Sequence, residues 1–187
     1  MATSANQEFP FIGVNHVALV CRDMARTVEF YRDTLGMPLV KTLNLPRDMG
    51  QHFFFDCGNG DCVAFFWFRD APPAAPGIAS PAQMPTRGPF VSAMGSMNHL
   101  AFNVRADKFD ACHARLVAKG VDVSVILNHD NSPTQVSKEL TDEVYVRSMY
   151  FFDPDGVLLE IAAWTGEFNE RDALDLPMNA DGVPTRV

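Results

Sequence analysis

An internal repeat is the feature that most constrains the fold of this chain. When the first part of the sequence is shifted by 83 positions, Asn15-His16 falls on Asn98-His99. Further along, the segment FFFD at 53–56 corresponds to YFFD at 150–153. A duplicated unit predicts two similar half-sheets that pair around a cleft.

Both repeats show the same order of predicted elements, namely a strand, a helix and three further strands. Apolar residues recur at helical spacing after Asp23, a predicted N-cap, and the two helices are predicted to stop at Gly36 and Gly120. Apolar runs bounded by turn residues predict the strands. In the first repeat, strands are predicted at 11–20, 39–45, 51–56 and 63–68, and the helix at 23–35. In the second, strands are predicted at 97–104, 121–127, 147–152 and 157–163, and the helix at 107–118.

The chain divides into four segments where its composition changes. Residues 11–68 form the first predicted module and residues 96–164 the second. Between them, residues 69–95 are rich in Pro and Ala, contain six prolines and show no hydrophobic period, which predicts a linker. Residues 129–146 are a polar, irregular insertion in the second module, and residues 165–187 are a polar C-terminal arm.

Charge and hydropathy exclude some classes of partner. The formal net charge is -8 and the chain has no basic run, which argues against nucleic acid or an anionic membrane surface as the main partner. No apolar run approaches the length needed to cross a bilayer, and the N-terminus lacks a signal-peptide pattern. We therefore expect a cytoplasmic protein. The four cysteines form no C-x-x-C pair, which favours free thiols over disulfides or a zinc knuckle.

Glu160 is an anomaly in the last predicted strand. Five apolar residues surround it, and an ionised acid in such a strand needs a cation or a strong set of donors. His16 and His99 each stand at the mouth of an apolar strand, at equivalent positions of the repeat. Two histidines and one glutamate predict a metal site. Asn15 and Asn98 are expected to support the neighbouring histidines.

Three stretches carry a resemblance to a known family. NHVALVCRDMARTVEFYRDTLGM, NHLAFNV and YFFDPDGVLLEI resemble the vicinal oxygen chelate superfamily. This superfamily includes glyoxalase I, bleomycin resistance proteins, extradiol dioxygenases, fosfomycin-resistance proteins and methylmalonyl-CoA epimerase. The resemblance covers roughly residues 11–164. It implies an α+β fold in which two tandem βαβββ modules form an open, cupped mixed sheet around a metal cleft.

The resemblance also implies a ligand set. His16, His99 and Glu160 match the family's ligand positions, whereas the fourth position is Ala64 in this chain. Two histidines and one carboxylate with open positions are typical of non-haem Fe(II) oxygenases. The same set occurs in manganese-dependent fosfomycin-resistance enzymes. We therefore expect a divalent metal ion, with Fe(II) preferred and Mn(II), Ni(II) or Zn(II) as alternatives.

Two further residues resemble those of extradiol dioxygenases. Tyr150 stands ten residues before Glu160, where those enzymes are expected to place a tyrosine that contacts the bound catecholate. His129 resembles a histidine that they place beside the substrate, where it would act as an acid or base. An aromatic set from the predicted strands is expected either to line the cup or to form core: Phe53, Phe55, Phe65, Trp67, Phe102, Tyr150 and Phe152.

The expected function is that of a metal-dependent enzyme resembling extradiol ring-cleavage dioxygenases, with a small catechol-like substrate held through vicinal oxygens. One alternative is an isomerase or lyase of the glyoxalase type, or a transferase of the fosfomycin-resistance type, in which the metal is a Lewis acid. Another is a non-catalytic binding protein of the bleomycin-resistance kind. We also expect a homodimer, and the modules could pair within one chain or between two.

Overall fold

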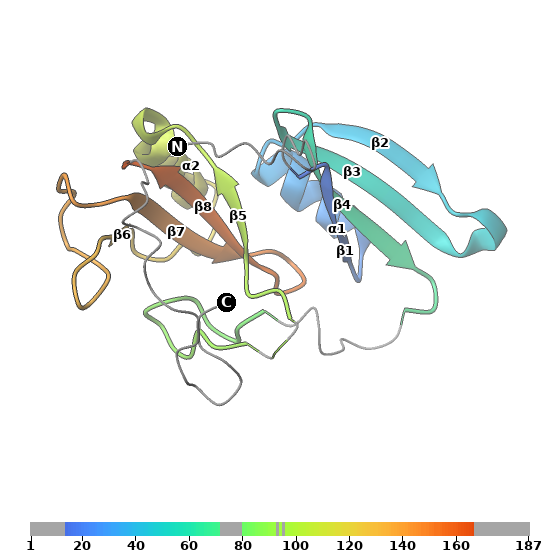
Figure 1. The fold of residues 1–187 in the computed structure, drawn as a ribbon. Coiled ribbons are helices and arrows are strands. Elements are labelled where there is room, and N and C mark those ends of the chain that lie inside the picture. The colour runs from blue at the N-terminus through green and yellow to red at the C-terminus, as the bar shows by residue number, and fades with distance from the viewer. Residues whose placement is uncertain (1–13, 72–79, 93, 95, 167–187) are drawn as a thin grey trace, which may run out of the picture.

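Two four-stranded mixed sheets make up the framework of this computed structural model, which describes residues 14–71, 80–92, 94 and 96–166 (Figure 1). The first sheet has the order β1-β4-β3-β2 and the second has the order β5-β8-β7-β6. The first-module strands are β1 (His16–Val20), β2 (Leu39–Asn44), β3 (Gly50–Gly58) and β4 (Asp61–Phe68). The second-module strands are β5 (Leu100–Asn103), β6 (Leu127–His129), β7 (Val146–Phe152) and β8 (Leu158–Trp164).

The two sheets have the same topology, as the repeat predicts. In each, the first strand pairs in parallel with the last, and the remaining pairs are antiparallel. Ala18 lies opposite Ala64 in the first sheet, and at the equivalent place in the second sheet Ala101 lies opposite Glu160. The α+β class and the two tandem βαβββ modules are thus confirmed.

Each module carries a helix after its first strand. In the first module, α1 (Met24–Val28) runs into a π-helix, η1 (Glu29–Thr34). Asp23 caps α1 by accepting hydrogen bonds from Ala25 N and Arg26 N, as predicted. The helix ends before Gly36, whose φ of +76° is one that residues with a Cβ rarely adopt. The remaining helices are η2 (Pro46–Asp48), η3 (Ala106–Lys108) and α2 (Phe109–Ala118).

The strand predicted at 121–127 is wrong, because β6 begins only at Leu127. Val121 and Val123 pack against the core as a strand would, but Ser124 Oγ accepts the backbone N–H of Tyr150 at 2.9 Å. A side chain thus takes the place of a backbone carbonyl, and the regular ladder begins only where Leu127 lies opposite Ser148. Parts of the predicted first strand, linker and C-terminal arm lie outside the described residues.

One hydrophobic core is shared by both modules. It includes Tyr31, Phe55 and Phe65 from the first module and Phe109 and Phe151 from the second, all at most 1% exposed. Each sheet therefore directs the face that packs on its helix toward the other module. The sheet faces turned away from this core are called the open faces below.

The parity of the strands decides which aromatic residues lie on the open faces. Because side chains alternate, a shift of one residue moves a side chain to the opposite face. Tyr150 and Phe152 pack together away from the shared core, as the predicted cup lining requires. The other five residues of the predicted lining pack in or against the shared core, so for them the aromatic-core alternative is correct: Phe53, Phe55, Phe65, Trp67 and Phe102.

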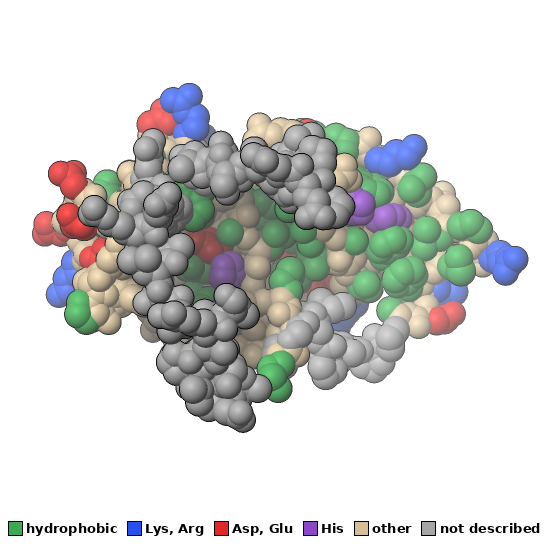
Figure 2. Space-filling model, viewed as in Figure 1, with side chains coloured by type: hydrophobic (Ala, Val, Ile, Leu, Met, Phe, Trp, Pro, Cys, Tyr) green, Lys and Arg blue, Asp and Glu red, His purple; other side chains and the backbone are tan. Residues whose placement is uncertain are grey.

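The open face of the first module instead presents other aromatic side chains. His52 stacks on Phe66, with ring centroids 3.5 Å apart, and also contacts Phe54. Phe66 in turn stacks on Phe68. Figure 2 shows hydrophobic side chains gathered over the β2, β3 and β4 side of the molecule.

None of the helices in the described residues combines the length and the hydropathy that a membrane-spanning helix requires.

Candidate metal centre

His99 and Glu160 meet on the open face of the second module. His99 directly precedes β5, and Glu160 lies in the middle of β8, which pairs in parallel with β5. His99 Nε2 lies 2.9 Å from Glu160 Oε2. The Glu160 side chain is only 8% exposed and that of His99 is 29% exposed. Two of the three predicted ligands thus converge.

The Asn98 side chain fixes the proton on His99. Its amide nitrogen donates to Phe90 O at 2.9 Å and to Ser92 Oγ at 3.1 Å, which orients the amide oxygen toward His99 Nδ1, 2.8 Å away. Because an amide oxygen only accepts, Nδ1 must carry a hydrogen. The Nε2 atom that faces Glu160 therefore either is protonated or presents a lone pair.

Glu160 remains ionised in this environment. Burial alone would raise the pKa of the carboxyl, but polar neighbours, led by a hydrogen bond from His99, lower the pKa below its ordinary value. A carboxylate that faces an Nε2 lone pair at this distance requires a cation between the two groups. One imidazole nitrogen and one carboxylate oxygen at this spacing are donors that divalent first-row metals accept. The residues present therefore fit a metal ion.

Tyr150 stands directly opposite Glu160 in the β7–β8 ladder. Its ring lies edge-on to His99, with centroids 5.7 Å apart, and it is 5% exposed. Burial and, next, the negative charge of Glu160 raise the pKa of the Tyr150 hydroxyl. The hydroxyl therefore keeps its proton at neutral pH and can act as a hydrogen-bond donor.

Ser148 adds a second hydroxyl to the same face. Its Oγ is buried and no described atom has hydrogen-bond geometry to it, although it is close enough to contribute to the lowered pKa of Glu160. An orphaned buried hydroxyl is uncommon in folded proteins. The Ser148 hydroxyl lies beside Glu160 and Tyr150 and helps to lower the pKa of both groups.

His16 lies apart from this pair. It repeats the second-module arrangement, since its Nδ1 lies 2.8 Å from Asn15 Oδ1. The centroids of the His16 and Phe54 rings are 5.7 Å apart. However, it is exposed on the open face of the first module. Within the described residues, no group of three His, Cys, Asp or Glu side chains is placed to hold a metal ion. Figure 2 accordingly shows histidine side chains at two separate places, one over each module.

His129 is not brought to the pair either. It ends β6 and lies opposite Val146, four residues along β7 from Tyr150. At the rise of a β-strand this separation is about 13 Å. The position expected from the sequence, beside a substrate held by His99 and Glu160, therefore does not match its place in the sheet.

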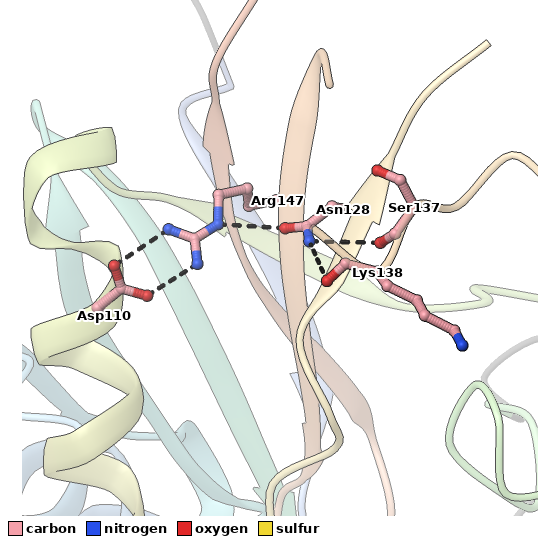
Figure 3. Close-up of polar contacts among 5 residues, drawn as sticks. All are labelled: Asp110, Asn128, Ser137, Lys138 and Arg147. Atoms are coloured by element: carbon pink, nitrogen blue, oxygen red, sulfur yellow. Dashed lines mark hydrogen bonds and ion pairs between the residues drawn. The ribbon is translucent and has the colours of Figure 1, made fainter. Parts of the chain in front are cut away.

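The insertion after His129 is fixed to the helix side of the second module (Figure 3). Arg147 donates to both carboxylate oxygens of Asp110, at 2.8 and 3.2 Å, and to Asn128 Oδ1. Asn128 in turn donates to the backbone oxygens of Ser137 and Lys138. This chain of contacts joins α2, β7, β6 and the insertion.

A cavity of about 460 Å³ lies elsewhere, at the seam between the two modules. It is bounded by the end of η1, by β5 and by α2, and its lining includes Cys57, Phe102 and Cys112. None of the predicted site residues contributes to that lining. The seam cavity is therefore separate from the His99–Glu160 pair.

Phe90 is a site residue that the sequence did not indicate. Its ring lies 5.8 Å from that of His99 and 6.2 Å from that of Tyr150. It belongs to the stretch interpreted as a linker, where it is a single aromatic residue among Pro, Gly and Ser. Only that isolated aromatic side chain could have drawn attention to the segment.

Comparison with protein families gives one match that covers most of the chain. The model described as the Glyoxalase/Bleomycin resistance protein/Dioxygenase superfamily matches residues 13–161. The match contains all three predicted ligands and nearly all of both modules, ending within β8.

Solved structures give matches of the same kind. The crystal structure of SMU.1112c is 26% identical, with a TM-score of 0.56, and the match covers 80% of this chain and 97% of that one. The lactoylglutathione lyase from Agrobacterium tumefaciens is 25% identical, with a TM-score of 0.50 and coverages of 83% and 96%. The fosfomycin resistance protein FosX from Listeria monocytogenes is 19% identical, with a TM-score of 0.50 and coverages of 83% and 95%, and supports the fold alone.

Proposed function

Because the chain belongs to the Glyoxalase/Bleomycin resistance protein/Dioxygenase superfamily, we propose that it is an enzyme dependent on a divalent metal ion held by His99 and Glu160. The observation that carries the proposal is the 2.9 Å approach of His99 Nε2 to the buried Glu160 carboxylate, with the Nδ1 proton fixed by Asn98. The substrate is a small molecule with two adjacent oxygen atoms.

The third ligand in this proposal is His16 of a second copy of the chain. The shared core holds the two modules together through their helix-bearing faces, so the open faces of one chain are turned away from each other. A symmetric dimer instead pairs the first-module open face of one copy with the second-module open face of the other. Each pairing then supplies one His16 to one His99–Glu160 pair.

The first-module open face has the character of a surface that is covered in an assembly. Val20 lies on it opposite Phe66, and Leu43 lies on it opposite His52. These two aliphatic side chains are 37% and 40% exposed. His52 Nε2 is buried but finds no hydrogen-bond partner among the described residues. An apolar face with an unsatisfied polar atom favours a protein partner over water.

For the reaction, we propose ring cleavage of a catechol-like substrate with dioxygen. A metal ion in this site would bring two vicinal substrate oxygens together with the second reactant and would stabilise negative charge on oxygen. The Tyr150 hydroxyl keeps its proton and would donate to one substrate oxygen. The Phe90 and Tyr150 rings, at 75° to each other, would enclose a flat ring beside His99. Fe(II) is the preferred metal because two histidines and one carboxylate leave coordination positions open.

A second candidate function is that of a lyase or isomerase in which the metal acts as a Lewis acid. It is favoured by the 25% identity with a lactoylglutathione lyase. The place of His129 also favours it, since the acid–base residue expected for ring cleavage is not next to Tyr150. In that case Tyr150 would donate a hydrogen bond to a developing oxyanion.

Elemental analysis of protein purified without oxygen tests the proposal first. Oxygen uptake with a panel of catechols, and conversion of the hemithioacetal of methylglyoxal and glutathione to S-lactoylglutathione, are then measured on the same sample. Iron near one atom per chain with oxygen uptake supports ring cleavage, whereas another metal with formation of the thioester supports the lyase. Protein that binds no added Fe(II), Mn(II), Ni(II) or Zn(II) would overturn the metal-dependent function and favour a binding protein.

A further inference from the structure

The segment 80–92 lies against the second module at several points. Ser80 Oγ accepts the backbone N–H of Leu158 at 3.0 Å. Met84 is 4% exposed and packs with Tyr150 and Leu158. Arg87 donates to the Asp122 carboxylate at 2.6 Å and to a backbone oxygen at 2.9 Å. These contacts make the segment part of the second module's structure.

Its last residues reach the candidate metal centre. Phe90 contacts the rings of His99 and Tyr150 and remains 38% exposed. The Phe90 carbonyl and the Ser92 hydroxyl both accept hydrogen bonds from the Asn98 amide nitrogen. The same Asn98 side chain accepts from His99 through its oxygen. Asn98 therefore contacts the segment through its amide nitrogen and the ring of His99 through its amide oxygen.

We propose that Asn98 is a positioning residue that couples the docking of segment 80–92 to metal binding at His99. The inference rests on the proposed function, since it requires the metal site. When the segment is docked, Asn98 is held with its oxygen toward Nδ1, which leaves Nε2 directed at Glu160. When the segment moves away, the amide loses the acceptors that orient it, and the ring loses its fixed position.

Coupling of this kind works in both directions. If the docked segment favours metal binding, then a bound metal must stabilise the docked segment by the same free energy. Phe90 gives the coupling a second consequence, because its ring moves with the segment and lies beside His99. Substrate that packs on Phe90 would therefore also increase the affinity of the site for the metal.

The first module provides a matched control. Asn15 Oδ1 faces His16 Nδ1 at the same 2.8 Å, but the Asn15 amide nitrogen has no hydrogen-bond partner among the described residues. Within the part of the chain that the structure describes, the two Asn-His pairs thus share the bond to the ring, and Asn98 alone also bonds to segment 80–92. A change at Asn15 therefore alters the ring contact of His16, the proposed third ligand, without altering any contact to segment 80–92.

The substitution Asn98→Asp separates the two roles of the side chain. A carboxylate oxygen still accepts from His99 Nδ1, but no N–H remains to donate to Phe90 O, and the new charge repels that carbonyl. Asn15→Asp makes the same chemical change in the first module. Both variants keep a side chain of the same size, so the fold of the module is retained, which circular dichroism verifies.

Hydrogen exchange of the segment, measured with and without Mn²⁺, provides the test. In the unmodified chain and in Asn15→Asp, saturating Mn²⁺ is expected to slow exchange across residues 80–92. In Asn98→Asp this slowing is lost, and the Kd for Mn²⁺ is higher than in Asn15→Asp, which carries the same added charge, by about 5-fold or more, the lower end of typical coupling between sites. Metal-dependent slowing that survives in Asn98→Asp would overturn the proposal.

The failure of the metal site itself gives a different result. If the unmodified chain does not bind Mn²⁺ or any of the other three metals, then the proposed function is wrong, and the coupling proposal is overturned with it. If it binds metal but exchange in 80–92 does not respond, then the site stands and only the coupling through Asn98 is wrong.

Discussion

The Tyr31 hydroxyl of the first module donates a hydrogen bond to Asp153 Oδ2 of the second, at 3.1 Å, and both side chains are buried. Asp153 Oδ1 in turn accepts the backbone N–H groups of Asp155 and Val157. The turn that leads to the strand of Glu160 is therefore joined to the helix of the other module. This contact helps to hold the modules by their helix-bearing faces, and for that reason their open faces point away from each other.

Tyr31→Phe is expected to destabilise the fold by about 1–3 kcal/mol at neutral pH, because a buried carboxylate loses a donor. Burial raises the pKa of Asp153 in the folded state, while its backbone and Tyr31 hydrogen bonds oppose that rise. Asp153 thus contributes stability below its unfolded pKa, near 4, and this contribution is lost as the pH rises through the folded value.

Removing the Tyr31 hydroxyl raises the folded pKa of Asp153 further, so the loss of stability in Tyr31→Phe is expected to be smaller at pH 4 than at pH 7. Urea unfolding at both pH values measures this difference. Equal losses at the two pH values would show that the hydroxyl does not act through the Asp153 charge.

Complementation between variants tests the shared site. His16→Ala and Glu160→Gln are each expected to bind little metal, but a mixture in equal amounts should recover about a quarter of the normal stoichiometry. The reason is that half of the dimers are mixed, and each mixed dimer has one intact site out of two. Mn²⁺ titration after subunit exchange measures the recovery.

A mixture of His99→Ala with Glu160→Gln is the control, because both changes fall in the same half of the site and no mixed dimer restores it. Recovery in both mixtures, or in neither, would contradict a site completed by the partner copy.

Glu160→Gln alone is expected to weaken metal binding by more than about 100-fold, which exceeds the usual effect of losing an outer partner of a ligand. The fold should be retained, since a glutamine fits the same space and Tyr150 stays opposite it. Glu143→Gln, at an exposed position in the insertion, is the matched control. Full metal occupancy in Glu160→Gln would remove Glu160 from the ligand set.

His129→Asn is expected to leave the affinity for metal unchanged and to alter kcat less than about 3-fold, because the backbone of His129 lies opposite Val146, about 13 Å along β7 from Tyr150. Steady-state rates with the best substrate from the catechol panel provide the check. A loss of 100-fold or more, typical for removal of a general acid or base, would restore the role expected from the sequence.

Arg147→Ala is expected to cost about 1–3 kcal/mol and to increase hydrogen exchange in residues 130–146. Arg147 is 12% exposed in its side chain and also lies 4.6 Å above the Phe109 ring, so packing is lost together with the ion pair. The control is Arg105→Ala, which removes the ion pair of Arg105 with Asp107. The side chains of Arg105 and Asp107 are 81% and 50% exposed, so the loss of this pair should cost less than about 0.5 kcal/mol. Similar losses in the two variants would contradict the anchoring role of Arg147.

The sequence predicts most of the local structure because local signals depend on near neighbours. Asp23 as a cap, Gly36 as a helix stop and the repeated Asn-His pairs can all be found without the fold, and the structure has each of them. The strand expected at 121–127 fails because the hydroxyl of Ser124 bonds to Tyr150, which is distant in sequence.

The sequence by itself predicted the two modules, their order of elements and a meeting of His99 with Glu160, and the parallel pairing of β5 with β8 brings those two residues together. Only the tertiary structure decided which faces of the two sheets pack together. That choice depends on how Tyr31, Phe55 and Phe151 fill one shared core, a matter of volume and shape that no periodicity records. It separates His16 from His99 within one chain, and it gives Phe90, in a stretch without any pattern, a place beside the His99–Glu160 pair.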